Sequence, residues 1–339
     1  ALLDAGDPDA VRGHAQYILR QNPALRRSVT DRWARAEKSW SHFDGITRVN
    51  DRTRDALASQ RLGRRPYSLS ALQRFAACPY QFLLGAIYRL QPAEQPHPLQ
   101  RLDPLTKGSL VHRMQASFFR ELERRGALPV TRESVDAALV ILDEVVEAVA
   151  NEYREDLVPA IDRVWREEVG AIARDLRGWA RNVSSDGVTW VPRYFEFSFG
   201  LPIDDDRDPR SVRDPVTIDN RFLLRGSIDL VDEHRQDGTL RVTDHKTGKD
   251  RTTPPLVIGG GAVLQPILYS MVMEQVTGKT VVESRLFFCT SAGGYTVQPA
   301  KLDAASRRMG IEALEIVDRA LERGELAAAP AEGACAWCD

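Results

Sequence analysis

Two aspartates and a lysine in the second half of the 339-residue chain have the types and spacing to act together. Asp244 and Lys246 are two residues apart in a predicted strand, so their side chains share a face. A strand predicted at 222–232 carries Asp229, and the loop between the strands contains Asp237-Gly238, a strong hairpin signal. If these two residues are the central turn residues, Asp229 lies opposite Lys246, with Asp244 one diagonal step away. The sequence therefore predicts two carboxylates and one ammonium group in a single cluster.

Such a cluster suits phosphodiester hydrolysis. Two close carboxylates repel each other unless a cation lies between them, and oxygen ligands favour a hard ion such as Mg²⁺ or Mn²⁺. That ion can bind a phosphate oxygen and lower the pKa of a bound water, while a neighbouring lysine offsets charge that builds up on the phosphate. The alternative is that these side chains pair across an exposed strand only for solubility.

The elements that must position this cluster follow from the spacing of apolar residues. Three helical stretches lie between 108 and 179, and the pattern then changes to strand-like alternation at 194–199. Helices followed by strand–strand–strand–helix–strand predict an α/β fold with a central mixed sheet flanked by helices. The other predicted elements are strands 222–232, 240–246, 281–289 and 295–298 and helices 262–276 and 304–323.

The predicted domain organisation is a connector followed by one domain. Residues 1–60 are polar and Arg-rich with a few apolar anchors, and they predict a helical connector from a preceding region. Residues 61–339 form the main domain, with a helical part at about 105–182 and a sheet core at about 190–325. The chain lacks an initial Met and nearly ends on a cysteine pair, so we expect it to be part of a longer protein. The apolar anchors are Trp33, Trp40 and Phe43.

Composition limits the possible classes. With 46 basic and 48 acidic residues the net charge is −2, so any nucleic-acid surface must be a local patch. No apolar run approaches the roughly 20 residues of a membrane span, and the N-terminus lacks the features of a signal peptide. We therefore expect a cytoplasmic protein without a membrane partner. Residues 277–280 (TGKT) end a predicted helix and lack the earlier loop glycine, so they do not form an ATP-binding loop.

Several segments together resemble the PD-(D/E)xK nuclease domain of the AddB and RecB type. These domains belong to subunits of bacterial helicase–nucleases that process DNA double-strand breaks. The resemblance covers the chain from about residue 67 to its end. It rests on residues 226–232 (GSIDLVD) with 244–248 (DHKTG), on 108–112 (GSLVH), on 265–269 (QPILY), and on 67–70 (YSLS) leading to 78–80 (CPY).

The resemblance implies a set of metal ligands and a catalytic lysine. Asp229 and Asp244 would bind the metal, Lys246 would be catalytic, and the backbone carbonyl of His245 would be a further ligand. His112 would complete the ligand set from a helix, although a histidine beside an apolar helix stripe is also typical of a packed core residue. One further acidic position, Glu196, matches less closely, and its alternation with phenylalanines also fits a solvated strand face.

The resemblance also assigns a DNA-binding helix face. Gln265 and Tyr269 are four residues apart and share one face of a helix. In the family this motif would contact DNA near the metal. The alternative is an ordinary helix surface in contact with solvent.

Three of the four cysteines resemble ligands of a 4Fe–4S cluster. In AddB-type nucleases one cysteine precedes the nuclease core and three follow it, and Cys78, Cys335 and Cys338 match the first three positions. The fourth would lie past Asp339. Cys289 falls in a predicted strand and is a poor substitute. The alternative is that these cysteines are buried and inert.

The resemblance therefore implies a Mg²⁺- or Mn²⁺-dependent exodeoxyribonuclease. It would act on DNA in double-strand-break repair and recombination, together with a partner subunit of an AddAB-like helicase–nuclease. One alternative is a CRISPR-associated exonuclease, which shares the core and the four-cysteine pattern. Another is an inactive nuclease fold that serves as a DNA-binding or scaffolding module.

Overall fold

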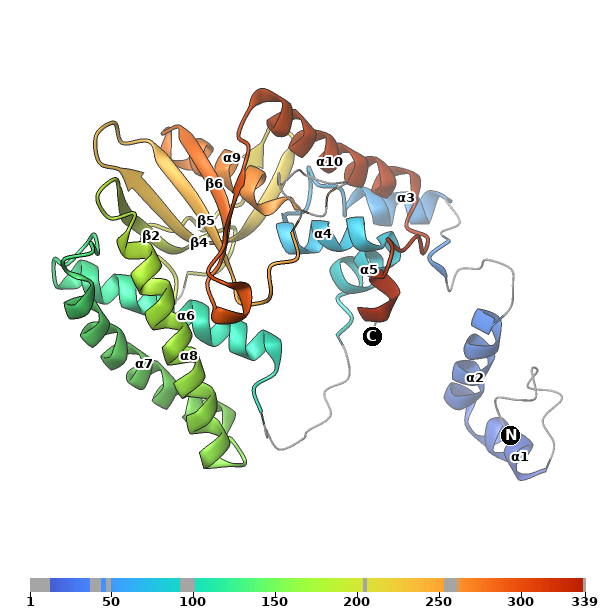
Figure 1. Ribbon diagram of the computed structural model, residues 1–339. Coiled ribbons are helices and arrows are strands. Elements are labelled where there is room, and N and C mark those ends of the chain that lie inside the picture. The colour runs from blue at the N-terminus through green and yellow to red at the C-terminus, as the bar shows by residue number, and fades with distance from the viewer. Residues whose placement is uncertain are drawn as a thin grey trace.

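A mixed sheet organises the fold, and its longest strand is the hub (Figure 1). In the computed structural model, which describes residues 13–36, 44–46, 50–91, 101–203, 206–252, 261 and 263–337, β4 pairs with four other strands. Strands β2, β3 and β5 pair with β4 antiparallel and β1 pairs with it parallel, whereas β6 joins β5 in parallel and β7 closes the edge antiparallel. The strands are β1 Tyr67–Ser68, β2 Trp190–Phe199, β3 Val216–Ile218, β4 Phe222–His234, β5 Leu240–Lys246, β6 Val281–Phe288 and β7 Val297–Ala300.

Helices cover both faces of this sheet. Helices α6 (Pro104–Arg124), α7 (Val135–Leu157) and α8 (Asp162–Ser184) share one apolar core with sheet residues such as Phe195 and Leu230. On the other side α4 (Leu69–Ala77), α9 (Gln265–Thr277) and α10 (Ala304–Arg323) share a second core, as Figure 1 shows. The remaining helical elements are α1 His14–Gln21, α2 Pro23–Ala36, α3 Asp51–Ala58, α5 Pro79–Phe82, the π-helical turn η3 Leu83–Ile87, and the 3₁₀ turns η5 Ser291–Gly293 and η6 Ala334–Trp337. The predicted α/β architecture with a mixed central sheet is confirmed.

Helix α6 is placed by its sequence at both its start and its buried face. Asp103 caps it by accepting hydrogen bonds from the backbone N–H groups of Leu105 and Thr106, and Pro104 occupies the first turn, where a missing N–H does no harm. Apolar side chains spaced four apart then form a fully buried stripe. This stripe fixes the rotation of the helix, so that the residues on its flank face the sheet. Its members are Leu110, Met114, Phe118 and Leu122.

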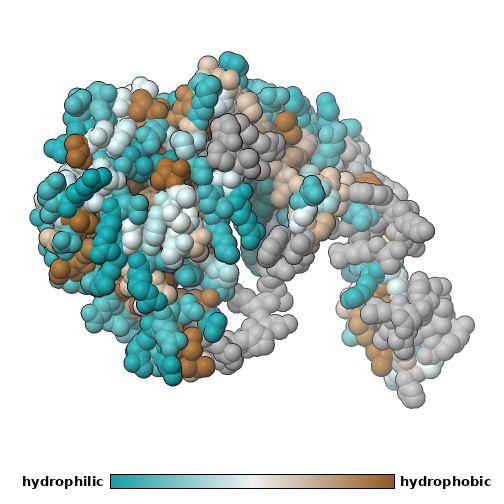
Figure 2. Space-filling view, viewed as in Figure 1, coloured by the Kyte–Doolittle hydropathy of each residue, from teal (hydrophilic) through white to brown (hydrophobic). Residues whose placement is uncertain are grey.

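The outward faces of the helices are mostly polar. Hydrophilic side chains cover most of the molecular face seen in Figure 2, over α7 and α8, and hydrophobic side chains appear there only in separate patches. This is the pattern expected of amphipathic helices packed on a sheet. No helix in the described part of the chain is long and apolar enough to cross a membrane.

The hairpin between β4 and β5 differs from the predicted register. Leu230 pairs with Thr243 and Glu233 with Leu240, and the N–H of His234 donates to the carbonyl of Thr239 at 2.8 Å. The loop therefore has four residues, 235–238, with Asp237-Gly238 as its second half. The Asp237 carboxylate accepts a hydrogen bond from the N–H of Thr239 at 3.0 Å. The predicted two-residue turn is wrong, and the register shifts by two residues. Because the shift is even, every side chain keeps its predicted face.

The N-terminal part is helical at 14–21, 23–36 and 51–58, whereas Ile46 forms an isolated β-bridge with Glu325. Helices α1 and α2 pack on each other through Leu19, Val29 and Trp33, whereas Trp40 and Phe43 lie outside the described residues. Leu57 of α3 already belongs to the core of the sheet, and Arg61 forms an ion pair with Asp318 of α10. We therefore propose that the main domain begins at α3, slightly before the predicted boundary at residue 61.

Candidate metal centre

Three carboxylates lie in a row across neighbouring strands. On β2, Glu196 falls between two residues paired with Leu230 and Ile228 of β4, so its position in the register is opposite Asp229. Extending the pairing of β4 with β5 by one residue places Asp244 opposite Asp229 on the other side. The sheet itself therefore brings Glu196, Asp229 and Asp244 together.

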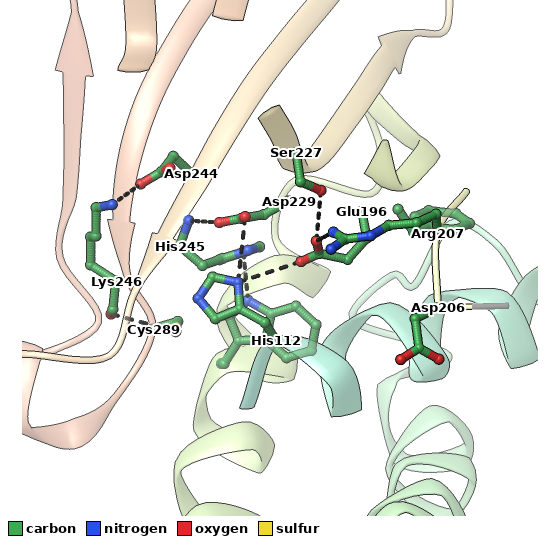
Figure 3. Close-up of polar contacts among 12 residues, drawn as sticks. His112, Glu196, Asp206, Arg207, Ser227, Asp229, Asp244, His245, Lys246 and Cys289 are labelled. Carbon is green, nitrogen blue, oxygen red and sulfur yellow. Dashed lines mark hydrogen bonds and ion pairs between the residues drawn. The ribbon is translucent and has the colours of Figure 1, made fainter. Parts of the chain in front are cut away.

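A histidine from α6 completes one half of this group (Figure 3). Nδ1 of His112 lies 3.4 Å from Oδ1 of Asp229 and 3.6 Å from Oε1 of Glu196. One potential ligand atom from each of these three residues lies within 4.8 Å of the others. A mixed set of nitrogen and carboxylate oxygen donors at this spacing fits a divalent cation.

The other half of the group pairs an aspartate with the lysine. Nζ of Lys246 lies 2.5 Å from Oδ2 of Asp244 and donates a hydrogen bond to Oε1 of Gln265 at 3.0 Å. In Figure 3 this pair lies on the opposite side of Asp229 from Glu196. Burial alone would lower the pKa of Lys246, but the neighbouring Asp244 outweighs it and raises that pKa above its ordinary value. The lysine therefore stays protonated.

The two central aspartates have opposite pKa shifts. Burial raises the pKa of Asp244 to about 6, and the charge of Asp229 adds to this rise. Burial also acts to raise the pKa of Asp229, but His112 outweighs it and lowers that pKa to about 2. For His112 itself, burial lowers the pKa, yet Asp229 and Glu196 raise it well above its usual value. The centre thus concentrates negative charge that favours a bound cation.

The backbone of His245 faces this centre. Its N–H donates to Oδ2 of Asp229 at 2.6 Å, whereas the carbonyl of the next residue, Lys246, turns to the N–H of Cys289 beyond β6. Neighbouring strand residues direct their backbone groups to opposite edges, so the carbonyl of His245 points toward the Asp229 side. Its role as a metal ligand stays a prediction. The His245 ring packs edge-on against the ring of His112, with centroids 6.3 Å apart, and accepts from Trp179 Nε1 at 3.2 Å.

Glu196 is held in an unusual backbone conformation. Its φ angle is 56°, in the left-handed region that non-glycine residues seldom occupy. Its carboxylate accepts from Oγ of Ser227 at 2.8 Å and from Arg207 at 3.3 Å. The side chain is only 15% exposed, so the alternative of a solvated strand face is wrong. Strain of this kind tends to be retained where a side chain must be aimed at a site.

Gln265 and Tyr269 have different surroundings although they share a helix face. Gln265 lies at the cavity and accepts from Lys246. Tyr269 is 5% exposed and packs edge-on against Phe199, so a solvent-facing position is wrong for this residue. Its hydroxyl lies so near Gly226 that a Cβ there would be 3.3 Å away. Direct contact with DNA stays a prediction for both residues, and for Tyr269 it would require rearrangement.

The centre opens into a cavity of about 500 Å³ with further charged and aromatic walls. Arg113, Tyr153, Asp206 and Arg207 line it, and the sequence pattern alone assigns no role to them. Arg113 follows His112 directly, which is a signal that could have been used. Arg207 lies in a stretch whose acidic residues and prolines predict only a loop, and nothing in the spacing points to Tyr153.

The comparisons with known proteins agree with this geometry. The sequence model of the PD-(D/E)XK nuclease superfamily matches residues 66–339. The chain belongs to the PD-(D/E)XK nuclease superfamily. The family predicted from the motifs is thus confirmed.

This PD-(D/E)XK chain is also similar to two curated proteins, each named as the B subunit of an ATP-dependent helicase/deoxyribonuclease. It is 27% identical over 212 residues to the protein from Moorella thermoacetica, a match that covers 59% of this chain and 17% of that protein. It is 28% identical over 220 residues to the protein from Symbiobacterium thermophilum, covering 61% of this chain and 17% of that protein. The match spans less than a fifth of the length of these relatives.

A substitution of His112 in this PD-(D/E)XK chain shows whether this residue acts as a metal ligand or as a packed core residue. We expect His112→Ala to raise the Mn²⁺ concentration needed for half-maximal DNA cleavage by about tenfold or more, because one donor is lost. The buried neighbour Gln115 lies outside the cavity lining, so Gln115→Ala serves as the control. An unchanged Mn²⁺ requirement with a lower melting temperature would instead assign His112 to packing.

A substitution of Gln265 shows whether this residue positions Lys246 or contacts DNA directly. Gln265→Ala removes the hydrogen bond to the Lys246 ammonium, and a hydrogen bond to a charged group contributes roughly 1.5–3 kcal/mol. We therefore expect kcat to fall by about tenfold or more, with DNA affinity measured in Ca²⁺ unchanged. Weaker DNA affinity with normal kcat would favour direct contact with DNA instead.

Proposed function

We propose that this chain is a metal-dependent deoxyribonuclease domain that hydrolyses DNA phosphodiester bonds with Mg²⁺ or Mn²⁺. The observation that carries this proposal is the convergence of Asp229, Asp244 and Lys246 in one cavity, together with Glu196 and His112. The inactive alternative is disfavoured because none of these groups is missing or displaced from the cavity.

The residues divide into a metal-holding set and a phosphate-directed lysine. Asp229, Asp244, Glu196 and His112 would hold the ion, with the carbonyl of His245 as a further ligand. When bound, a divalent ion polarises a phosphate oxygen and lowers the pKa of water. Lys246 stays protonated between Asp244 and Gln265, so its ammonium can donate to a phosphate oxygen as negative charge develops there.

We further propose that the domain works as an exodeoxyribonuclease within an AddAB-like helicase–nuclease that repairs DNA breaks. The names of both relatives combine helicase and deoxyribonuclease and describe one subunit, which supports a partner subunit and a DNA substrate. The same names favour this role over a CRISPR-associated exonuclease.

DNA cleavage by the purified chain tests the proposed function. We expect end-labelled DNA to be degraded in Mg²⁺ or Mn²⁺ and to remain intact after chelation, since the carboxylates cannot act on phosphate without a cation. Labels at either end also report the polarity. The proposal would be contradicted by DNA that stays intact at saturating metal, or by degradation that persists in the chelator.

We also propose an iron–sulfur cluster that joins the start of the domain to its C-terminal segment. Ala331 donates a backbone hydrogen bond to the carbonyl of Ala77 at 2.8 Å, so the segment that leads to Cys335 passes beside Cys78. In Figure 1 the red C-terminal turn, η6, lies next to α5. Thiolates from these two places suit such a cluster, and Cys338 lies outside the described residues. Cys289 is remote from them, since it is buried next to Lys246.

The cysteine proposal predicts a coloured protein. The protein purified without oxygen in its full natural length should be brown and contain iron and sulfide. Cys78→Ala should bleach it and make the C-terminal segment more sensitive to protease, because the cross-link that closes a long loop is lost. The control Cys289→Ala should stay brown. Colourless, iron-free wild-type protein would leave these cysteines as packing residues.

A further inference from the structure

The cavity continues past the metal centre on the side away from Lys246. Figure 3 shows Asp206 and Arg207 beyond Glu196, opposite the pair formed by Asp244 and Lys246. Arg113 from α6 and Tyr153 from α7 line this second part of the same cavity. When a phosphate of a DNA strand lies at the metal centre, a neighbouring nucleotide must lie either toward Lys246 or toward Asp206 and Arg207.

Tyr153 supplies an aromatic surface at the right place. It lies in the last turns of α7, next to Glu152, which pairs with Arg113 of α6, and it is only partly buried. On one side it packs against the core of α6, α7 and α8, and it also lines the cavity. A ring supported from behind in this way can stack on a nucleobase at low entropic cost, because its own rotamer is already fixed.

Arg113 supplies a phosphate-binding group next to that ring. Its side chain is 18% exposed and forms ion pairs with Asp206 and with Glu152, whose side chains are 59% and 57% exposed. Nε of Arg113 is buried and has no hydrogen-bond partner among the residues that the structure describes. Buried donors are nearly always paired, and the guanidinium fork matches a phosphate, so a phosphate that enters the cavity would complete its bonding.

We propose that Tyr153 and Arg113 form a nucleotide-binding wall, in which the tyrosine ring stacks on a base next to the scissile phosphate and Arg113 binds the phosphate of that nucleotide. The proposal rests on the proposed nuclease function. Arg207 lines the same cavity and forms an ion pair with Glu196, so it connects the wall to the metal centre. Because every base has a stacking face, the wall accepts any sequence but requires a base that is not paired in a duplex.

Binding to two single strands tests the wall without any need for cleavage. The affinities of the full chain in Ca²⁺ are measured by fluorescence anisotropy for a short labelled oligothymidine and for an abasic strand of equal length. Stacking contributes roughly 1–3 kcal/mol per base. Tyr153→Ala should therefore weaken oligothymidine binding about tenfold and leave the abasic strand unchanged, while Tyr153→Phe binds both like wild type. Arg113→Gln should weaken both strands alike, because both carry the phosphate.

The controls are residues of the same types outside the cavity. Tyr88 is 62% exposed and Arg163 is 84% exposed, so Tyr88→Ala and Arg163→Gln should bind both strands like wild type. If Tyr153→Ala weakens binding of the oligothymidine and of the abasic strand equally, Tyr153 has a merely structural role and the proposed wall is wrong. The proposal is also wrong if Tyr153→Ala does not weaken binding of either strand. Failure of the nuclease function is a separate result, namely intact DNA at saturating metal despite normal binding.

Discussion

Asp229→Asn is expected to slow DNA cleavage by about a thousandfold or more while the fold stays intact. A metal ion provides several kcal/mol of transition-state stabilisation, and Asp229 lies at the centre of the group that would hold it. Asparagine keeps an oxygen that can accept from the N–H of His245, so this buried donor remains paired. Alanine would leave it unpaired and confuse loss of metal with loss of stability.

The control variant for Asp229→Asn is Asp143→Asn, because Asp143 forms an exposed ion pair with Arg177. Cleavage rates are measured at saturating Mn²⁺, and melting temperatures are measured without metal. Both variants should melt within a few degrees of wild type, and only Asp229→Asn should be inactive. An Asp229→Asn variant that cleaves at the wild-type rate would remove this residue from the site.

Lys246→Met should change cleavage and metal binding in opposite directions. The loss of an ammonium aimed at the developing phosphate charge should lower kcat by roughly 10²–10³-fold. Lys246 also neutralises Asp244, so its removal leaves that carboxylate freer to bind a cation. We therefore expect Mn²⁺ to bind somewhat more tightly by calorimetry, even though cleavage nearly stops.

Two further variants define the role of Lys246. Lys246→Arg should not restore activity, because a planar guanidinium cannot occupy the place of a compact ammonium between Asp244 and Gln265. Lys279→Met, at an exposed pair with Glu233, is the control for general charge loss. Normal kcat with weaker Mn²⁺ binding in Lys246→Met would mean that this lysine only organises the metal site.

The central cluster was predictable because it depends on short-range rules. Asp244 and Lys246 share a face whenever their segment is a strand, and a hairpin brings Asp229 to the same face. The predicted register is wrong by two residues, since the loop has four residues rather than two. That error does not change which side chains share a face, because side-chain faces repeat every two residues.

The other parts of the site depend on contacts that periodicity does not encode. Glu196 is suggested only by resemblance, and its aim depends on a left-handed backbone angle. Tyr153 reaches the cavity because α7 packs against α6, which is a tertiary contact between two helices. The burial of Tyr269 likewise follows from how α9 packs on the sheet rather than from the spacing of its motif.

The most direct test of the central claim is anomalous diffraction from crystals of the wild-type chain and of Asp229→Asn, each soaked in Mn²⁺. The account predicts a strong manganese peak beside the Asp229 and Asp244 carboxylates and His112 in the wild type, and its loss in the variant. A wild-type crystal without manganese at this centre, from protein that cleaves DNA in the same Mn²⁺ concentration, would contradict it.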